Sequence, residues 1–129
     1  MKALLDTHTF LWWITDQPRL PVGIWEIIEN GENDLLVSAA SGWEIMIKFQ
    51  LGRLRLPEEP EDYLMEQIQK NAFQTLPIRM QHSLHLRRLP LLHKDPFDRM
   101  LIAQARFENI PILTSDSMIA RYPVEAVWS

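Results

Sequence analysis

Four acidic residues occupy positions from which carboxylates of separate segments would meet in one place. Asp6 directly follows one short apolar stretch, and Asp116 follows another by three residues. Glu44 and Asp98 fall in the first turns of two predicted helices. A set of carboxylate oxygens without thiolates is the kind of site that binds Mg²⁺ or Mn²⁺. Such an ion activates water and stabilises in-line attack on a phosphodiester.

Gathering these acids would be costly for the protein alone. Two unit charges ~5 Å apart repel by about 3 kcal/mol at an effective dielectric near 20. A fold tolerates such a cluster mainly when a cation joins it or when some of the carboxylates take up protons. If the four acids converge, they therefore indicate a metal site.

Each acid also has a purely structural interpretation. Asp6 and Asp116 suit turns or helix N-caps, and Asp116 would cap a turn at Met118. Glu44 stands three residues after Ser41, which is the spacing of a capping box. The sequence leaves both interpretations open for each position.

The stretch HKDPFDRM (93–100) poses the same question most sharply. Asp95 is a good N-cap, and Pro96 suits the first helical position. Asp98 would complement the positive end of the helix dipole. We predict that Asp95 is the cap. On this stretch alone a plain helix start is the favoured interpretation, and a further role for Asp98 stays open.

The predicted elements alternate between short apolar strands and helices. We expect helices over residues 7–14, 22–29, 41–50, 61–71, 81–88 and 96–108, with a helical turn over 118–121. We expect strands over 3–5, 35–37, 73–78, 110–113 and 124–127, the last one at an edge, and a loop between Pro18 and Pro21. This order predicts an α/β protein whose mostly parallel sheet is covered on both faces. In such sheets, ligands bind beyond the carboxyl ends of the strands, where Asp6 and Asp116 stand.

The composition is that of an ordinary globular protein. The chain has 129 residues, of which 47% are hydrophobic and 23% charged, and it has no cysteine. We expect one domain over residues 1–129, without disulfides or thiolate metal sites. No apolar run approaches the ~18 residues of a membrane span. The start of the chain also lacks the apolar core of a signal peptide, so we expect a cytoplasmic protein.

The net charge of −4 hides an uneven distribution. Basic residues and histidines are concentrated in one span: Arg79, His82, His85, Arg87, Arg88, His93, Lys94 and Arg99. This span is either a face that contacts phosphates or a solvated helix surface.

Several other polar and aromatic residues admit two roles. His8 and His93 would contact phosphate or relay protons, or else lie at the surface or hydrogen-bond to the metal ligands, which we favour. Thr114 and Ser115 would hold a metal-bound water or bond within their loop. Arg99 would contact the scissile phosphate or pair with an acid. The tryptophans near the acids would stack on bases or, as their spacing favours, pack in the core or a dimer interface; they are Trp12, Trp13 and Trp43.

Four motifs together resemble PIN-domain proteins of the VapC toxin type. They are LLDTHTFLWW (4–13), SGWEIMIK (41–48), HKDPFDRMLIAQA (93–105) and ILTSD (112–116), in the order of that family and over nearly the whole chain. The resemblance implies a three-layer α/β/α sandwich and assigns the acidic quartet of the family to Asp6, Glu44, Asp98 and Asp116. It implies an endoribonuclease dependent on Mg²⁺ or Mn²⁺, in which metal-activated water is the nucleophile. It also implies inhibition by a cognate antitoxin and a homodimer.

Two alternatives from other classes remain. A signalling receiver domain is also a parallel α/β fold of this size, but it needs an acidic pair after the first strand and a late lysine. Asp6 has no acidic neighbour, and no lysine follows Asp116. The second alternative is a catalytically silent PIN scaffold that binds RNA or a protein partner.

Overall fold

The computed structural model describes residues 1–15 and 19–129. Its centre is a five-stranded sheet with the order β3-β2-β1-β4-β5, in which every pairing is parallel. The strands are β1 (Lys2–Leu5), β2 (Asp34–Ser38), β3 (Gln74–Leu76), β4 (Ile112–Leu113) and β5 (Ala126–Val127). The predicted strand at the edge is therefore confirmed as β5.

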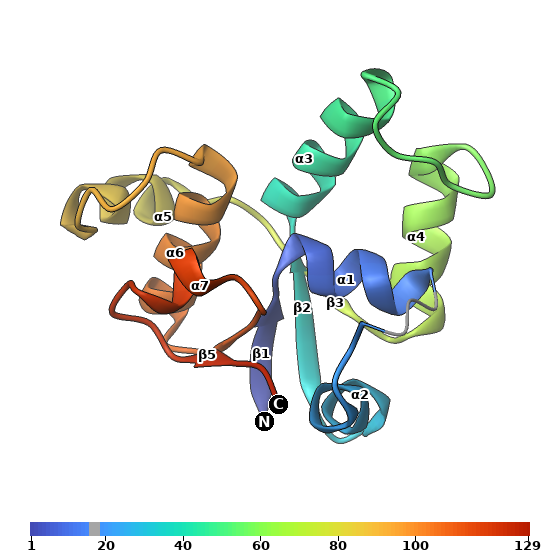
Figure 1. Cartoon of the computed structure of the whole chain (residues 1–129), viewed down its shortest axis with the longest axis horizontal. Coiled ribbons are helices and arrows are strands. Elements are labelled where there is room, and N and C mark those ends of the chain that lie inside the picture. Colours follow the sequence, from blue (N-terminus) through green and yellow to red (C-terminus); the bar gives the residue numbers. More distant parts are fainter. Residues whose placement is uncertain (16–18) are drawn as a thin grey trace.

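Helices cover both faces of this sheet. On one side lie α1 (Thr7–Ile14), α2 (Val22–Glu29) and α4 (Pro60–Lys70). On the other lie α5 (Met80–His85), the 3-10 helix η1 (Leu86–Arg88), α6 (Pro96–Glu108) and α7 (Ser117–Ala120). Helix α3 (Ala39–Gln50) extends beyond the carboxyl end of β2 (Figure 1). The predicted α/β/α sandwich is confirmed.

The three central strands, β1, β2 and β4, are apolar because both of their faces are buried. Successive side chains point to opposite faces, so Ala3 and Leu5 join the core under α1, α2 and α4. Leu4, between them, joins the core under α6 and α7. This alternation makes one continuous apolar run serve two separate cores.

Most predicted helices agree with the structure. Those over 7–14, 22–29 and 96–108 have the predicted bounds, and the one over 61–71 is shifted by one residue. The helix over 81–88 divides into α5 and η1, and the one over 41–50 begins two residues earlier. The strands over 73–78, 110–113 and 124–127 are shorter than predicted. Of the predicted loop, Pro18 lies outside the described residues.

The strand order places a switch point beside β1. The chain runs from β1 to β2 and β3 on one side and then adds β4 and β5 on the other. Crevices form at such points, beyond the carboxyl ends of the strands on either side. Asp6 follows β1, and Asp116 follows β4 after two residues.

No helix in the described ranges is both long and apolar enough to cross a membrane.

Candidate active site

Asp6 stands at the carboxyl end of β1 and is 2% exposed. Its backbone N–H donates to the carbonyl of Leu113 in β4 at 3.1 Å, which fixes it at the switch point. It occupies the N-cap position of α1, but its side chain makes no capping hydrogen bond. Its Oδ2 accepts instead from the hydroxyl of Thr114 at 2.8 Å. The side chain of Asp6 is therefore tied to the loop after β4 through Thr114.

Asp116 is joined to the same point through Thr114. The Thr114 hydroxyl accepts from the backbone N–H of Asp116 at 3.0 Å while it donates to Asp6. The Oδ1 of Asp116 accepts from the backbone N–H of Met118 at 2.8 Å. The predicted capping role of Asp116 is thus confirmed. Of the two roles considered for Thr114, the structure shows hydrogen bonding within the loop.

Asp95 and Asp98 divide two tasks at the start of α6. Asp95 is the N-cap, since its Oδ1 accepts from the backbone N–H groups of Phe97 at 2.9 Å and Asp98 at 3.1 Å. The prediction for Asp95 is confirmed. The side chain of Asp98 is left free of the helix backbone and contacts Nε2 of His93 through Oδ2 at 3.1 Å. His93 therefore orients the carboxylate of Asp98 through this hydrogen bond.

The hydrogen bonds around Tyr122 determine how His93 faces Asp98. The hydroxyl of Tyr122 lies 3.0 Å from Nη1 of Arg99 and 3.3 Å from the backbone N–H of His93, and both groups can only donate. The single proton of the Tyr122 hydroxyl is then donated to Nδ1 of His93, at 2.7 Å. Neutral His93 consequently carries its proton on Nε2 and donates it to Asp98. Arg99 also donates to the carbonyl of Pro90 at 2.9 Å. It forms no ion pair with an acid among the described residues, and its contact with phosphate stays a prediction.

Three of the acids act on one another electrostatically. Burial raises the pKa of Asp6; the Thr114 hydrogen bond and the charge of His8 oppose this shift, and the charge of Asp116 adds to it. Burial raises the pKa of Asp98 to about 6, with the His93 hydrogen bond opposing and the charges of Asp95, Asp6 and Asp116 adding. Like charges that raise the pKa of a neighbouring carboxyl group create the demand for a cation.

Glu44 reaches the same region on α3. Helix α3 is capped by Ser38, whose hydroxyl accepts from the backbone N–H of Ala40 at 3.0 Å. Ser41 lies inside the helix and shares a 2.8 Å hydrogen bond with the hydroxyl of Thr7. The predicted capping box of Ser41 and Glu44 is therefore wrong, because the helix starts earlier than expected.

The carboxylate of Glu44 is buried and ion-paired. Its Oε2 lies 2.9 Å from Nζ of Lys48, one turn further along α3. Glu44 does not contribute to the pKa shifts of Asp6 and Asp98. The Ser41–Thr7 bond nevertheless brings the first turn of α3 against the residue that follows Asp6.

The donor set has the chemistry of a site for Mg²⁺ or Mn²⁺, since it offers carboxylate oxygens only. Within residues 1–15 and 19–129, no three acidic or histidine side chains are arranged so as to hold a metal ion as they stand. The mutual repulsion of Asp6, Asp98 and Asp116 is the feature that a cation would relieve. The residues fit such an ion by chemistry.

Two histidines of the predicted basic span, His82 and His85, are engaged in contacts with α6, and a phosphate contact by the rest of the span stays a prediction. His82 is fully buried, where it accepts from the backbone N–H of Arg79 and contacts Glu108 at 2.9 Å. His85 accepts from Nε of Arg106 at 3.1 Å. Burial, followed by the charges of Arg106, Arg88 and His82, lowers the pKa of His85. The two histidines hold α5 against α6.

The tryptophans divide between the core and the surface. Trp12 and Trp13 are partly buried against the core beneath α1, as their spacing favours. Trp43 is 60% exposed and meets Phe97 edge to face at a centroid distance of 5.0 Å. Because Trp43 precedes Glu44 and Phe97 lies in the first turn of α6, this aromatic pair joins the start of α3 to the start of α6.

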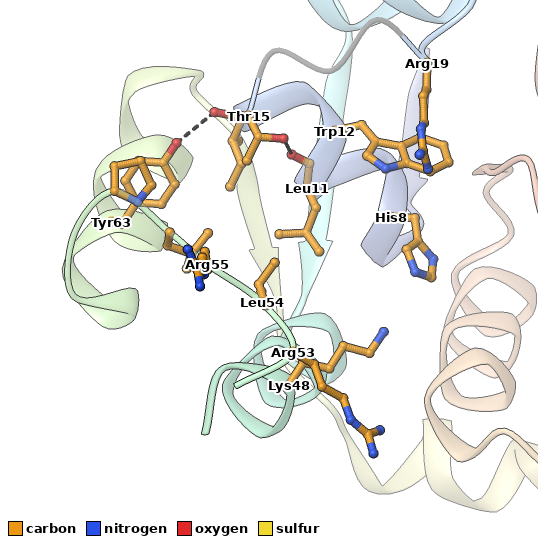
Figure 2. A pocket seen from close by; sticks show the side chains of 13 residues that line it. His8, Leu11, Trp12, Thr15, Arg19, Lys48, Arg53, Leu54, Arg55 and Tyr63 are labelled. Carbon is orange, nitrogen blue, oxygen red and sulfur yellow. Dashed lines mark hydrogen bonds between the residues drawn. The ribbon is translucent and has the colours of Figure 1, made fainter. Parts of the chain in front are cut away.

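The sequence interpretation missed a basic groove next to these acids. The groove has a volume of about 800 Å³ and runs between α1 and the segment that follows α3 (Figure 2). Its cationic residues include Arg19, Lys48, Arg53 and Arg55. They are scattered over residues 19–55, and only the fold brings them together.

Comparison with known proteins gives one family and one fold. The PIN domain family model matches residues 3–125. Ribonuclease VapC16 of Mycobacterium tuberculosis (strain ATCC 25618 / H37Rv) is 34% identical over 61 residues. This match covers 47% of the present chain and 43% of that protein, so it spans less than half of the relative's length.

Three solved structures share the fold at low sequence identity. VapBC2 from Rickettsia felis, bound to a DNA fragment from its promoter, has a TM-score of 0.74 at 14% identity, with 100% of both chains covered. DNA-bound VapBC from Salmonella typhimurium has a TM-score of 0.67 at 16% identity, with 98% of this chain and 97% of that chain covered. VapBC-1 from nontypeable Haemophilus influenzae has a TM-score of 0.65 at 15% identity, with the same coverage.

Proposed function

Because the chain belongs to the PIN domain family, we propose that it is a metal-dependent endoribonuclease of the VapC type. The observation that carries this proposal is the placement of Asp6 and Asp116 at the carboxyl ends of β1 and β4, where Thr114 joins them. Asp98, in the first turn of α6, lies close enough for the charges of both to raise its pKa. An enzyme that hydrolyses phosphodiesters with a bound cation needs such a group of carboxylates. The similarity to a relative named a ribonuclease supports RNA as the substrate.

Each residue of the quartet has a defined task in this proposal. Asp6, Asp98 and Asp116 would hold Mg²⁺ or Mn²⁺, and Glu44 would complete the quartet from α3. The bound ion would supply an activated water and stabilise the charge that develops on the phosphate. Each of the three aspartates is held by a neighbour: Thr114 bonds Asp6, His93 bonds Asp98, and the start of α7 bonds Asp116.

We also propose partners and an assembly for the protein. The similar structures from three bacteria are described as VapBC, which supports the toxin part of a toxin–antitoxin pair, held inactive by a cognate antitoxin. We expect residues 1–129 to act as one PIN domain in the cytoplasm and to form a homodimer. Light scattering of the purified protein would measure its mass in solution and test the dimer.

The experiment that tests the activity uses purified protein free of antitoxin. Total cellular RNA is incubated with it in Mg²⁺, in Mn²⁺ and in excess EDTA, and the new RNA ends are mapped. Cleavage that needs the metal supports the proposal. Cleavage that continues undiminished in EDTA would refute the metal mechanism.

A second candidate is a catalytically silent scaffold that binds RNA or a protein. Two features favour it. In the described ranges, no three acidic or histidine side chains are arranged so as to hold a metal ion, and Glu44 pairs with Lys48. RNA that is bound but never cut, in either metal, would support this candidate.

A further inference from the structure

The basic groove is a concavity with an apolar floor and a cationic rim. Its apolar lining includes Leu54 and Leu56, from the segment after α3, and Leu11 of α1. Figure 2 shows cationic side chains on both sides: Arg19 and His8 with α1, Arg53 and Lys48 opposite. An apolar floor and a positively charged rim are complementary to a ligand that has flat apolar parts and a negatively charged backbone.

The arginines of the groove have no acidic partner among the described residues, whereas Lys48 pairs with Glu44. No acidic residue is found among the described residues that line it, although the protein carries a net charge of −4. Arg53 and Arg55 are exposed, and neither guanidinium group has a hydrogen-bond or ion-pair partner among the described residues. Two free guanidinium groups on one wall are available to bind phosphates.

Part of the rim is already held in place. The guanidinium of Arg19 lies over the ring of Trp12 at 5.5 Å from its centroid. The imidazole of His8 lies against the same ring, at a centroid distance of 6.0 Å. Trp12 thus orients two polar side chains, which reduces the entropy lost when they bind a ligand.

One end of the groove reaches the acidic residues. His8 follows Asp6 by two residues, and its charge acts on the Asp6 carboxylate. Lys48 lines the groove and contacts Glu44 at 2.9 Å. Two members of the quartet are therefore in direct electrostatic contact with residues of the groove. A polymer bound along the groove would therefore reach the carboxylates at that end.

We propose that this groove binds a single strand of RNA and leads it to the acidic quartet. The inference rests on the proposed function and adds to it the path of the substrate. Phosphates would lie on Arg53, Arg55 and Arg19, with bases over the leucine floor. A single strand is favoured over a duplex, because a duplex keeps its bases stacked inside and has no apolar surface to offer the floor.

Binding without cleavage tests the groove directly. The affinity of a short, fluorescently labelled single-stranded RNA is measured in EDTA over a range of salt concentrations. The groove variant carries Arg53→Ala and Arg55→Ala. Its two lost phosphate contacts should weaken binding about tenfold or more at 0.1 M salt and reduce the slope of log K against log salt by about 1.4.

The matched control carries Arg87→Ala and Arg88→Ala in η1, two exposed arginines with the same change of charge. Its affinity and slope should stay close to those of the wild type. An unchanged groove variant, or an effect confined to the control, would overturn the inference. So would a groove that bound an acidic amphipathic peptide of Leu and Glu through Arg53 and Arg55 but did not bind RNA.

The two proposals fail separately. If the protein cuts RNA in Mn²⁺ while the groove variant binds as tightly as the wild type, the path is wrong and the activity stands. If no RNA is cut in any metal but the groove variant still loses affinity, the activity is wrong and the RNA-binding groove stands.

Discussion

Thr114 donates its hydroxyl to Oδ2 of Asp6 at 2.8 Å across 108 residues of sequence. The hydroxyl oxygen of Thr114 also accepts from the backbone N–H of Asp116, so the side chain of Thr114 joins two acids of the quartet. This hydrogen bond favours the ionised form of Asp6 against the effect of burial.

Thr114→Val removes this hydrogen bond while keeping the shape of the side chain. The pKa of Asp6 should rise further, and the affinity for Mn²⁺ should fall about tenfold, as for other residues that orient metal ligands. Thr114→Ser retains the hydroxyl and serves as the control. The measurement is the rise in melting temperature with added Mn²⁺. A valine variant that responds to Mn²⁺ as the wild type does would show that Thr114 has only a structural role.

Tyr122→Phe tests the arrangement that orients His93. In the wild type at pH 8, the side-chain ¹⁵N shifts of His93 should report a proton on Nε2 and none on Nδ1. Without the tyrosine hydroxyl, Nδ1 loses its donor, so both tautomers should be present and Mn²⁺ affinity should fall. A wild-type His93 protonated on Nδ1 would be incompatible with the proposed donation to Asp98.

Asp98→Asn separates a metal ligand from an acid that only complements the helix dipole. If the dipole alone mattered, the loss would be roughly 0.3–1 kcal/mol of stability, with metal binding intact. We expect the opposite: the metal-free protein keeps or gains stability, and stabilisation by Mn²⁺ disappears. Asp95→Asn is the control, because asparagine caps a helix about as well as aspartate. Thermal melts in EDTA and in Mn²⁺ distinguish the two outcomes.

The raised pKa of Asp98 also predicts a dependence on pH. Its value is about 6 in the folded protein against an ordinary 3.8, so between these values the folded state binds more protons than the unfolded chain. The contribution of Asp98 to the free energy of unfolding therefore falls as the pH rises from about 4 to about 6. Urea denaturation in EDTA should show Asp98→Asn gaining on the wild type over this range. A difference between the two that does not change with pH would argue against the shift.

The antitoxin is expected to cover the acidic edge and to place an arginine or lysine among the carboxylates. The reason is electrostatic, since Asp6, Asp98 and Asp116 repel one another when no cation is bound. Carbodiimide labelling of the complex should leave these side chains protected, and the free protein should be labelled at Asp98. An antitoxin complex in which Asp6, Glu44, Asp98 and Asp116 remain open to solvent would disprove this mode of inhibition.

Local signals in the sequence account for the parts of the fold that were predicted well. The bounds of α6 follow from the Asp95 cap and Pro96, and the apolar strands fix the order of the sheet. The start of α3 was misplaced because Ser38 and Ser41 are both plausible caps, and only the contact of Ser41 with Thr7 distinguishes them.

The predicted site was incomplete for a different reason. The partners of Asp6 and Asp98 come from Thr114 and from a tyrosine-supported histidine, and such pairings depend on the folded chain. His82 was counted with the basic surface because its sequence neighbours are polar, yet it is fully buried. The groove that contains Arg53 and Arg55 could not be predicted, because no local sequence pattern relates these arginines to residues of α1.

The central claim is that this acidic quartet cuts RNA with a bound metal. The most direct measurement is the single-turnover cleavage rate of one RNA in Mn²⁺ for the wild type, Asp6→Asn, Glu44→Gln, Asp98→Asn, Asp116→Asn and Asp95→Asn. Loss of a ligand should exceed the 10–100-fold cost of losing a residue that merely orients one. We therefore predict that each quartet variant is slower by more than about 100-fold, while Asp95→Asn keeps nearly the wild-type rate. Quartet variants that cut RNA as fast as Asp95→Asn would contradict the account.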